Sequence, residues 1–220
     1  MGECMAFDEY DKYEQSEIVQ KWLRENGLSI VVGIAIGLVG IFGWQQWRHH
    51  QARNESAASQ LYQQIRVALA SGSAADASRL VQQMQQDYAK SPYAVFASSD
   101  QARQQVQLKQ LDKADSSLQW ARSHAQQPAL KALVELRLAQ VELAQGNDAA
   151  ALTTLDQIPA DSYPGLAQEL RGDVLVKLGR SDDARKAYQT ALSALGGDAP
   201  QRGALQMKLD DLAVAGKQGA

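Results

Sequence analysis

An uncharged stretch of 22 residues near the N-terminus, residues 26–47, constrains this chain more than any other feature. Within it, residues 28–47 number 20. A helix of that length, at about 1.5 Å per residue, spans roughly 30 Å, which is the thickness of the hydrocarbon core of a membrane. Tryptophans, which favour the membrane–water interface, flank the stretch at Trp22, Trp44 and Trp47. We therefore predict a transmembrane helix over residues 28–47 rather than a buried helix of a soluble protein.

The residues around this segment favour an anchor that is not cleaved. A signal peptide begins with a basic region, whereas residues 1–17 carry six Asp and Glu side chains, and residues 44–54 contain no small-x-small cleavage site. We accordingly divide the chain into an acidic tail (1–27), a transmembrane helix (28–47) and a folded region (48–220). Three Lys or Arg residues flank each end of the helix, so the positive-inside rule does not choose an orientation.

The acidic tail contains a candidate short helix. Ser16 is a favourable N-cap, and an apolar edge follows it. Asn and Gly commonly end helices, so we predict that this helix ends at Asn26 and Gly27, before the membrane segment begins.

Three glycines lie on one face of the predicted membrane helix. Gly33, Gly37 and Gly40 are spaced at i, i+4 and i+7, the kind of small-residue pattern that lets two membrane helices approach closely. We predict that they form a helix-packing face. The alternative is that they reflect only the high glycine content of membrane helices.

The rest of the chain carries a repeated helix–turn–helix pattern. In its clearest copy, residues 170–192, a small residue at a helix crossing precedes a turn glycine and an Ala-x-x-x-aromatic-x-x-Ala series, here Gly172, Gly179, Ala184, Tyr188 and Ala191. The preceding copy lies 33 residues earlier, at Ala139, Gly146 and Ala151. Two further copies lie upstream at successive offsets of 37 residues, at Ala114 and at Gly72 with Ala77. We predict that these small residues pack the two helices of each unit together and that the glycines turn the chain.

Prolines follow nearly the same period. Pro92, Pro128 and Pro164 lie 36 residues apart, each near the expected start of a unit's first helix, where proline is tolerated. A generic four-helix bundle predicts no fixed period, whereas stacked repeats do. We therefore predict an all-α fold: a tetratricopeptide-like α-solenoid of about four helical hairpins. A capping helix is expected to close it at Leu205, Leu209 and Leu212.

Solenoids of this type bind segments of other proteins on the face formed by the first helices of their hairpins. By repeat position, we predict that this face contains Tyr62, Arg66, Phe96, Arg103, Gln140, Glu169 and Asp173.

The residues that catalysis or metal binding needs do not occur in recognisable patterns. The adjacent His49 and His50 would point about 100° apart on a helix, which is poor geometry for a metal. The phosphate-binding, dinucleotide-binding, zinc-hydrolase and serine-hydrolase motifs do not occur. Cys4 is the single thiol, and a net charge of −3 gives no large basic surface for nucleic acid. We predict no catalytic residue, no metal and no cofactor, and hence not an enzyme.

Several segments of the chain together form a recognisable layout: the acidic tail, the VQKWLRENG segment (residues 19–27), a glycine-rich membrane helix that ends among tryptophans, and repeats that include SPYA (91–94) and GRSDDARKAY (179–188). In these features the chain resembles the YfgM family of ancillary SecYEG translocon subunits. The resemblance extends over essentially the whole chain.

The resemblance implies a single-pass protein of the bacterial inner membrane, with a cytoplasmic N-terminus and a periplasmic repeat domain. The implied partners are the SecYEG channel, a PpiD-type periplasmic chaperone and translocating polypeptides that are passed between them. A scaffold that organises other cell-envelope machinery without binding such polypeptides is the alternative function.

Overall fold

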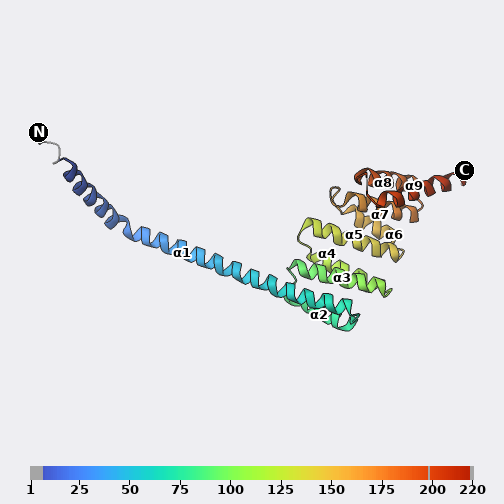
Figure 1. The fold of residues 1–220 in the computed structure, drawn as a ribbon, viewed down its shortest axis with the longest axis horizontal. Coiled ribbons are helices and arrows are strands. Elements are labelled where there is room, and N and C mark those ends of the chain that lie inside the picture. The colour runs from blue at the N-terminus through green and yellow to red at the C-terminus, as the bar shows by residue number, and fades with distance from the viewer. Residues whose placement is uncertain (1–6, 198, 219–220) are drawn as a thin grey trace. The chain divides into compact units, whose positions relative to one another are not determined.

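The computed structural model describes residues 7–197 and 199–218, in which every regular element is an α-helix (Figure 1). The chain divides into two compact units, Met1–Asn54 and Glu55–Ala220. Helix α1, Phe7–Ala70, contributes to both units.

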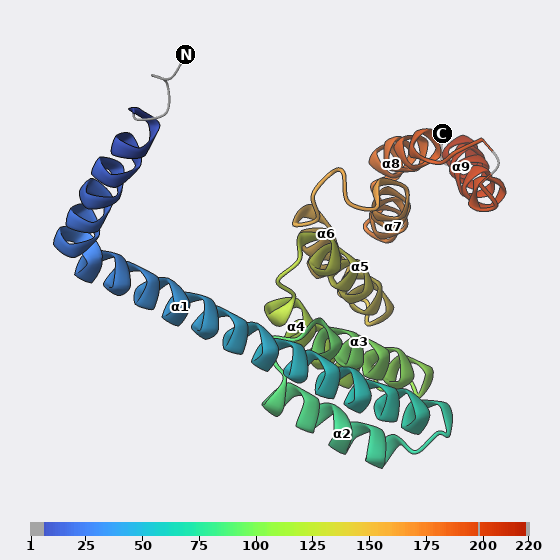
Figure 2. The same cartoon turned by 60° about the vertical axis from the view of Figure 1, so that its left-hand side comes forward.

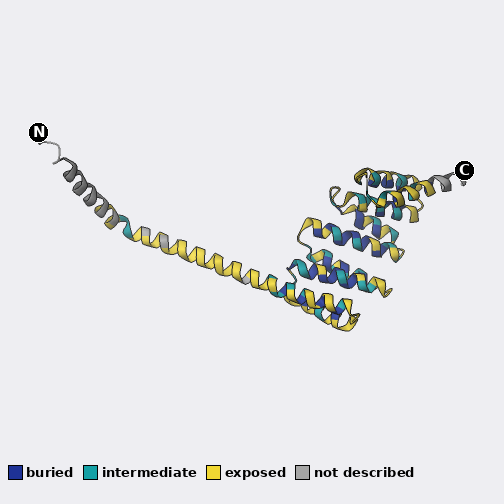
Figure 3. Cartoon of the chain, in the orientation of Figure 1, coloured by how far each residue is buried: buried dark blue, intermediate teal, exposed yellow. Residues whose placement is uncertain are grey.

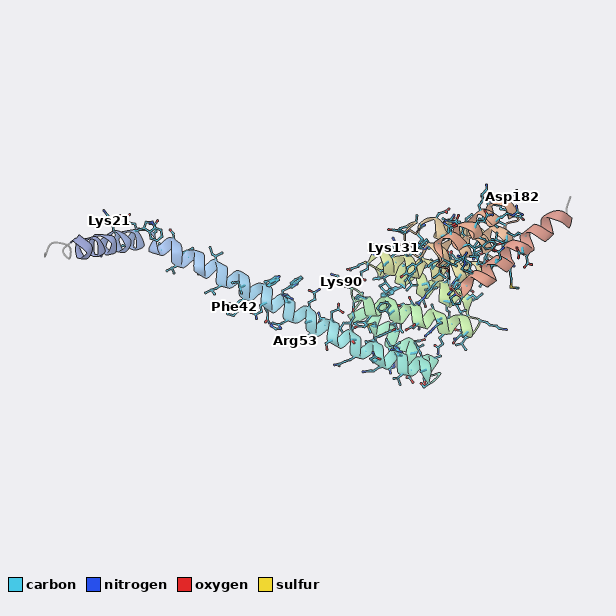
Figure 4. All side chains as sticks on the ribbon, turned by 45° about the horizontal axis from the view of Figure 1, so that its top comes forward. Lys21, Phe42, Arg53, Lys90, Lys131 and Asp182 are labelled. Atoms are coloured by element: carbon cyan, nitrogen blue, oxygen red, sulfur yellow. The ribbon has the colours of Figure 1, made fainter. Side chains whose placement is uncertain are left out.

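The first unit consists of α1 up to Asn54. Between residues 28 and 49 all described side chains are exposed, and many are large and apolar (Figure 3). Figure 4 shows one of them, Phe42, projecting away from the helix. One window of this helix has a mean hydropathy of 2.2, and no residue in it is buried. Among the described residues, this is the one helix that is long and apolar enough to cross a membrane.

The prediction that the helix of the tail ends at Asn26 and Gly27 was wrong. Helix α1 continues through both residues, and the Asn26 Nδ2 donates a hydrogen bond to the Trp22 carbonyl one turn earlier, at 3.1 Å. An interior glycine costs only about 1 kcal/mol of helix stability relative to alanine, so a single glycine does not stop a helix between two helix-forming segments. The side chain of the predicted cap, Ser16, lies outside the described residues.

The second unit is a stack of hairpins, which Figure 2 shows in chain order, and it confirms the predicted tetratricopeptide-like solenoid. The four hairpins are residues 55–70 of α1 with α2 (Ala74–Asp87), α3 (Pro92–Gln107) with α4 (Leu111–His124), α5 (Pro128–Ala144) with α6 (Asp148–Asp156), and α7 (Pro164–Lys177) with α8 (Ser181–Ala194). Helix α9 (Gln201–Gln218) follows, and its Leu205, Leu209 and Leu212 pack against α7 and α8 as the capping helix.

The helix starts that the prolines predict are confirmed. Pro92, Pro128 and Pro164 are the first residues of α3, α5 and α7. Proline lacks an amide hydrogen, and the first turn of a helix leaves its amide hydrogens unpaired in any case. The 36-residue proline period therefore marks where each first helix begins.

All four hairpins turn through the same backbone geometry. The second residue after the end of each first helix has a positive φ: 74° at Gly72, 58° at Lys109, 80° at Gly146 and 72° at Gly179. In each turn the amide of the next residue donates a hydrogen bond to the carbonyl five residues earlier, as from the Asn147 amide to the Glu142 carbonyl at 2.8 Å. This is the Schellman arrangement, for which glycine is the preferred residue. The second hairpin uses lysine instead, which the sequence pattern did not reveal.

Replacing Lys109 with glycine is expected to stabilise the protein by about 1 kcal/mol. A left-handed conformation is unfavourable for a residue with a Cβ. The turn at Lys109 is the one hairpin turn without a glycine at this position, and glycine would remove the cost there. Thermal melting followed by circular dichroism measures the gain. Lys109→Ala keeps the Cβ and is the matched control. An equal gain in both variants would show that removal of the lysine charge, rather than relief of the backbone, is responsible.

The predicted crossing residues lie in the core. Four clusters of buried apolar side chains run along the unit, and each contains residues from neighbouring helices. The alanines of the repeat pattern are all 0% exposed: Ala77, Ala114, Ala139, Ala151, Ala184 and Ala191. At Gly172 there is no room for even a methyl group, because a Cβ would overlap the ring of Tyr188. A period of small residues thus coincides with the places where helices meet closely.

Candidate binding surface on the first helices

The seven residues predicted for binding come from the first helices α1, α3, α5 and α7. We call the surface that they share the first-helix face. It has three parts along the stack: an aromatic cluster on α1 and α3, two cavities between α3, α5 and α7, and an ion-pair cluster where α9 meets α7.

The aromatic cluster consists of Tyr62, Tyr93 and Phe96, whose ring centroids lie 5.6–6.4 Å apart. The Tyr62 hydroxyl donates a hydrogen bond to Asp100 at 2.7 Å. Burial, followed by this hydrogen bond, raises the pKa of Tyr62 to about 12, so the hydroxyl stays protonated. Phe96 remains 37% exposed, and the rings offer an apolar surface with a fixed geometry.

Two predicted arginines lie beside this cluster. The Arg103 guanidinium pairs with Asp100 at 3.5 Å, while its side chain remains 73% exposed. Arg66 is exposed, and its charge acts on Tyr62 by lowering the pKa that burial raises. The structure therefore brings Tyr62, Arg66, Phe96 and Arg103 together.

Two cavities open between neighbouring first helices. The first, of about 220 Å³, is lined by α3, α4 and α5 and includes Arg103 and Gln140. The second, of about 340 Å³, lies between α5 and α7 and includes Gln140, Glu169 and Asp173. Gln140 lines both, so the predicted residues of α3, α5 and α7 belong to adjoining cavities.

The ion-pair cluster occupies the end of the face. The Lys208 amine of α9 donates hydrogen bonds to Glu169 at 2.9 Å and to both carboxylate oxygens of Asp173 at 2.8 and 2.9 Å. Burial alone would lower the pKa of Lys208, but the bonds to the two carboxylates outweigh it and raise the pKa. Asp173 also accepts a hydrogen bond from the Tyr188 hydroxyl at 2.7 Å. Glu169 and Asp173 thus hold the capping helix in place.

Sequence reasoning missed several residues of this face. Arg137 lines both cavities, and it lies three residues before Gln140, so helical spacing places it on the same side of α5. Helical spacing also places Tyr93 and Asp100 on the same side of α3 as the predicted Phe96 and Arg103, and sequence reasoning did not use this signal. Lys208 gave no such signal, because its partners lie 35 and 39 residues away in the sequence.

Two glutamates with perturbed titration lie inside the stack instead of on this face. Glu135 and Glu142 of α5 are 1% and 8% exposed, and burial raises the pKa of each. Perturbed carboxyl groups often mark functional sites. These two are enclosed by the helices around α5, out of reach of a bound molecule. Among the described residues, no group of three His, Cys, Asp or Glu side chains is placed to hold a metal ion.

The glycines of the membrane segment have open surroundings. Gly33, Gly37 and Gly40 are exposed on α1, and a Cβ added at any of them would meet nothing within 4 Å. That they pack against another membrane helix stays a prediction.

Comparison with known proteins gives matches over nearly the whole chain. A family model described as a tetratricopeptide repeat-like domain matches residues 20–214. A protein of Escherichia coli K12, named ancillary SecYEG translocon subunit, is 30% identical over 201 residues, which cover 91% of this chain and 96% of that protein. A Haemophilus influenzae protein of the same name is 31% identical over 205 residues, covering 92% and 99%.

Solved structures share the fold. The tetratricopeptide-like repeats of a kinesin light chain protein from Podosopora anserina superpose with a TM-score of 0.57 at 16% identity, covering 74% of this chain and 89% of that one. At this identity the likeness concerns the fold alone.

Proposed function

Because the chain belongs to the family of ancillary SecYEG translocon subunits, we propose that it is a membrane-anchored subunit that helps to pass translocated polypeptides to periplasmic chaperones. One observation carries the proposal. The relatives that are named as translocon subunits match the chain from the membrane segment through the repeats, so both parts that the function needs are included.

The repeat unit has a surface suited to such clients. A polypeptide that leaves a channel is extended and exposes apolar side chains, which the aromatic cluster and the two cavities of the first-helix face would accept. The cavities are small, so each contact is weak and dissociates quickly. Fast dissociation suits a protein that hands its client onward.

The proposed arrangement places the N-terminus in the cytoplasm, α1 across the inner membrane, and the repeat unit in the periplasm. The proposed partners are SecYEG and a PpiD-type periplasmic chaperone. The anchor keeps the binding face at the membrane, which raises its effective concentration near the channel without any direct contact with the client.

The single thiol, Cys4, gives a direct test of this topology. In intact spheroplasts, a membrane-impermeant maleimide is expected to leave Cys4 unlabelled, and lysis is expected to expose it to the reagent. The double variant Cys4→Ser, Lys90→Cys carries its only thiol at an exposed turn of the repeat unit. This thiol should be labelled in intact spheroplasts, before lysis. Labelling of Cys4 before lysis would reverse the orientation and remove the periplasmic assignment.

Client binding can be tested with a photo-crosslinking amino acid at Phe96, during translocation of a radiolabelled secretory protein that is stalled in the channel. We expect adducts from Phe96 and none from Arg79, an exposed position on the second helix α2. Equal yields at both positions, or none at Phe96, would instead favour a scaffold that does not bind clients.

A further inference from the structure

Arg137 on α5 is a partly buried cation that pairs with no acidic side chain among the described residues. No residue that the structure describes forms a hydrogen bond or an ion pair with its guanidinium. Glu169 and Asp173 line the second cavity together with Arg137, and both are engaged by Lys208. By contrast, its neighbour Arg103 pairs with Asp100.

The first cavity adjoins this cation. Apolar side chains form most of its wall, namely Ala102, Val106, Leu118, Val141 and Ala144. Its volume of about 220 Å³ lies below the roughly 300–1,000 Å³ of pockets that enclose whole small molecules, so it suits a single aliphatic side chain. Ser99 also lines it, and the Ser99 Oγ is buried without a hydrogen-bond partner among the described residues.

We propose that Arg137 and this cavity bind an extended polypeptide segment in which an Asp or Glu lies two residues from an aliphatic side chain. In an extended chain, residues i and i+2 point to the same side, so the carboxylate can reach the guanidinium while the aliphatic side chain fills the cavity. Arginine binds carboxylates with two parallel hydrogen bonds, which adds direction to the contact. The inference rests on the proposed function only in placing polypeptide binding on the first-helix face.

The surrounding charges favour a carboxylate over a phosphate. Glu169 and Asp173 share the single cation Lys208, so about one negative charge remains beside Arg137 and would repel a phosphate, which carries about two negative charges. A single carboxylate meets less repulsion and needs only one guanidinium. The carboxylate of an internal Asp or Glu is therefore the ligand group assigned here.

The test uses the full-length protein in lipid nanodiscs and a short fluorescent peptide, acetylated and amidated at its ends, with the pattern Asp-Ala-Leu between Ser and Gly residues. Fluorescence anisotropy measures binding. We expect Arg137→Ala to weaken binding by about tenfold, the usual effect of losing a charged hydrogen-bond partner. Arg137→Glu should abolish it and favour the peptide in which Lys replaces Asp. Val106 lies on the cavity wall and is 39% exposed. Val106→Gln should weaken binding of the peptide that contains Leu and leave the affinity for a peptide with Ser in place of Leu unchanged.

Arg79→Ala is the matched control, since it removes an exposed arginine of α2 outside this face and should leave the affinity unchanged. Circular dichroism confirms that each variant is folded. Undiminished binding by Arg137→Ala would overturn the proposal, and so would binding only when the peptide ends in a free carboxylate. Absence of binding by the unmodified protein would also overturn it. Peptide binding by a chain that fails to copurify with SecYEG would keep this inference and reject the translocon function.

Discussion

Replacing Gly172 with alanine is expected to destabilise the repeat unit by roughly 1–3 kcal/mol, although alanine is the better helix former. Gly172 lies on α7 where α8 crosses it, and an added Cβ would overlap the Tyr188 ring. The ring has little freedom to move away, because Tyr188 is 3% exposed and its hydroxyl is bonded to Asp173, which in turn binds Lys208 of α9. The methyl group therefore forces the helices apart or breaks this series of contacts.

The matched control is Gly203→Ala on α9, where an added Cβ meets nothing within 4 Å. There the same substitution should be neutral or stabilising by up to about 1 kcal/mol, because only helix propensity changes. Chemical denaturation of residues 54–220, which we expect to be soluble when produced alone, measures both. Gly172→Leu and Ala184→Leu should cost more than Gly172→Ala because they add more volume. Ordinary stability in these variants would mean that the repeat register is wrong.

Changing Gly33, Gly37 and Gly40 together to leucine is expected to detach the protein from its membrane partner while keeping it in the membrane. Leucine inserts into a bilayer at least as favourably as glycine. Helix association within lipid depends on close packing, which small residues permit and leucine prevents. In the isolated chain the three glycines face open space, so leucine creates no clash within the protein itself.

The measurement compares how much SecYEG and, separately, how much chaperone copurifies with each variant and with the unchanged protein, at matched amounts of protein in the membrane. Ala35→Leu is the control, since it enlarges a small residue on a different side of the same helix. We expect the triple variant to lose SecYEG, the control to retain it, and both to keep a chaperone contact made by the repeat unit. Undiminished recovery of the channel with the triple variant would show that attachment comes from the repeats or from the tail.

The sequence predicts this fold well because the residues that begin and end its helices act locally. Proline and glycine act through their own backbones, so Pro128 marks the start of α5 and Gly146 marks its end without reference to the rest of the chain. Lys109 shows the limit of such signals. The backbone hydrogen bonds of the turn hold Lys109 in a left-handed conformation that its residue type disfavours, and no local sequence pattern indicates this.

The candidate surface was only partly predictable. Repeat register placed Gln140 and Phe96 on the right helices, but it does not say which charges are already used within the protein. Asp173 appeared available in the sequence, and it is Lys208, from a helix 35 residues later, that binds it. Arg137 became notable only once the structure showed that the described residues leave its charge unpaired. Such facts depend on contacts between distant residues.

Affinity purification from membranes in a mild detergent would show whether this protein is an anchored subunit of the SecYEG translocon. The protein would carry an affinity tag at its C-terminus, and mass spectrometry would identify the proteins recovered with it. We expect recovery of SecY, SecE and SecG in amounts comparable to the tagged chain, from the membrane fraction that resists alkaline carbonate. Release of the protein by carbonate, or a purified protein with no SecYEG components above an untagged control, would contradict it.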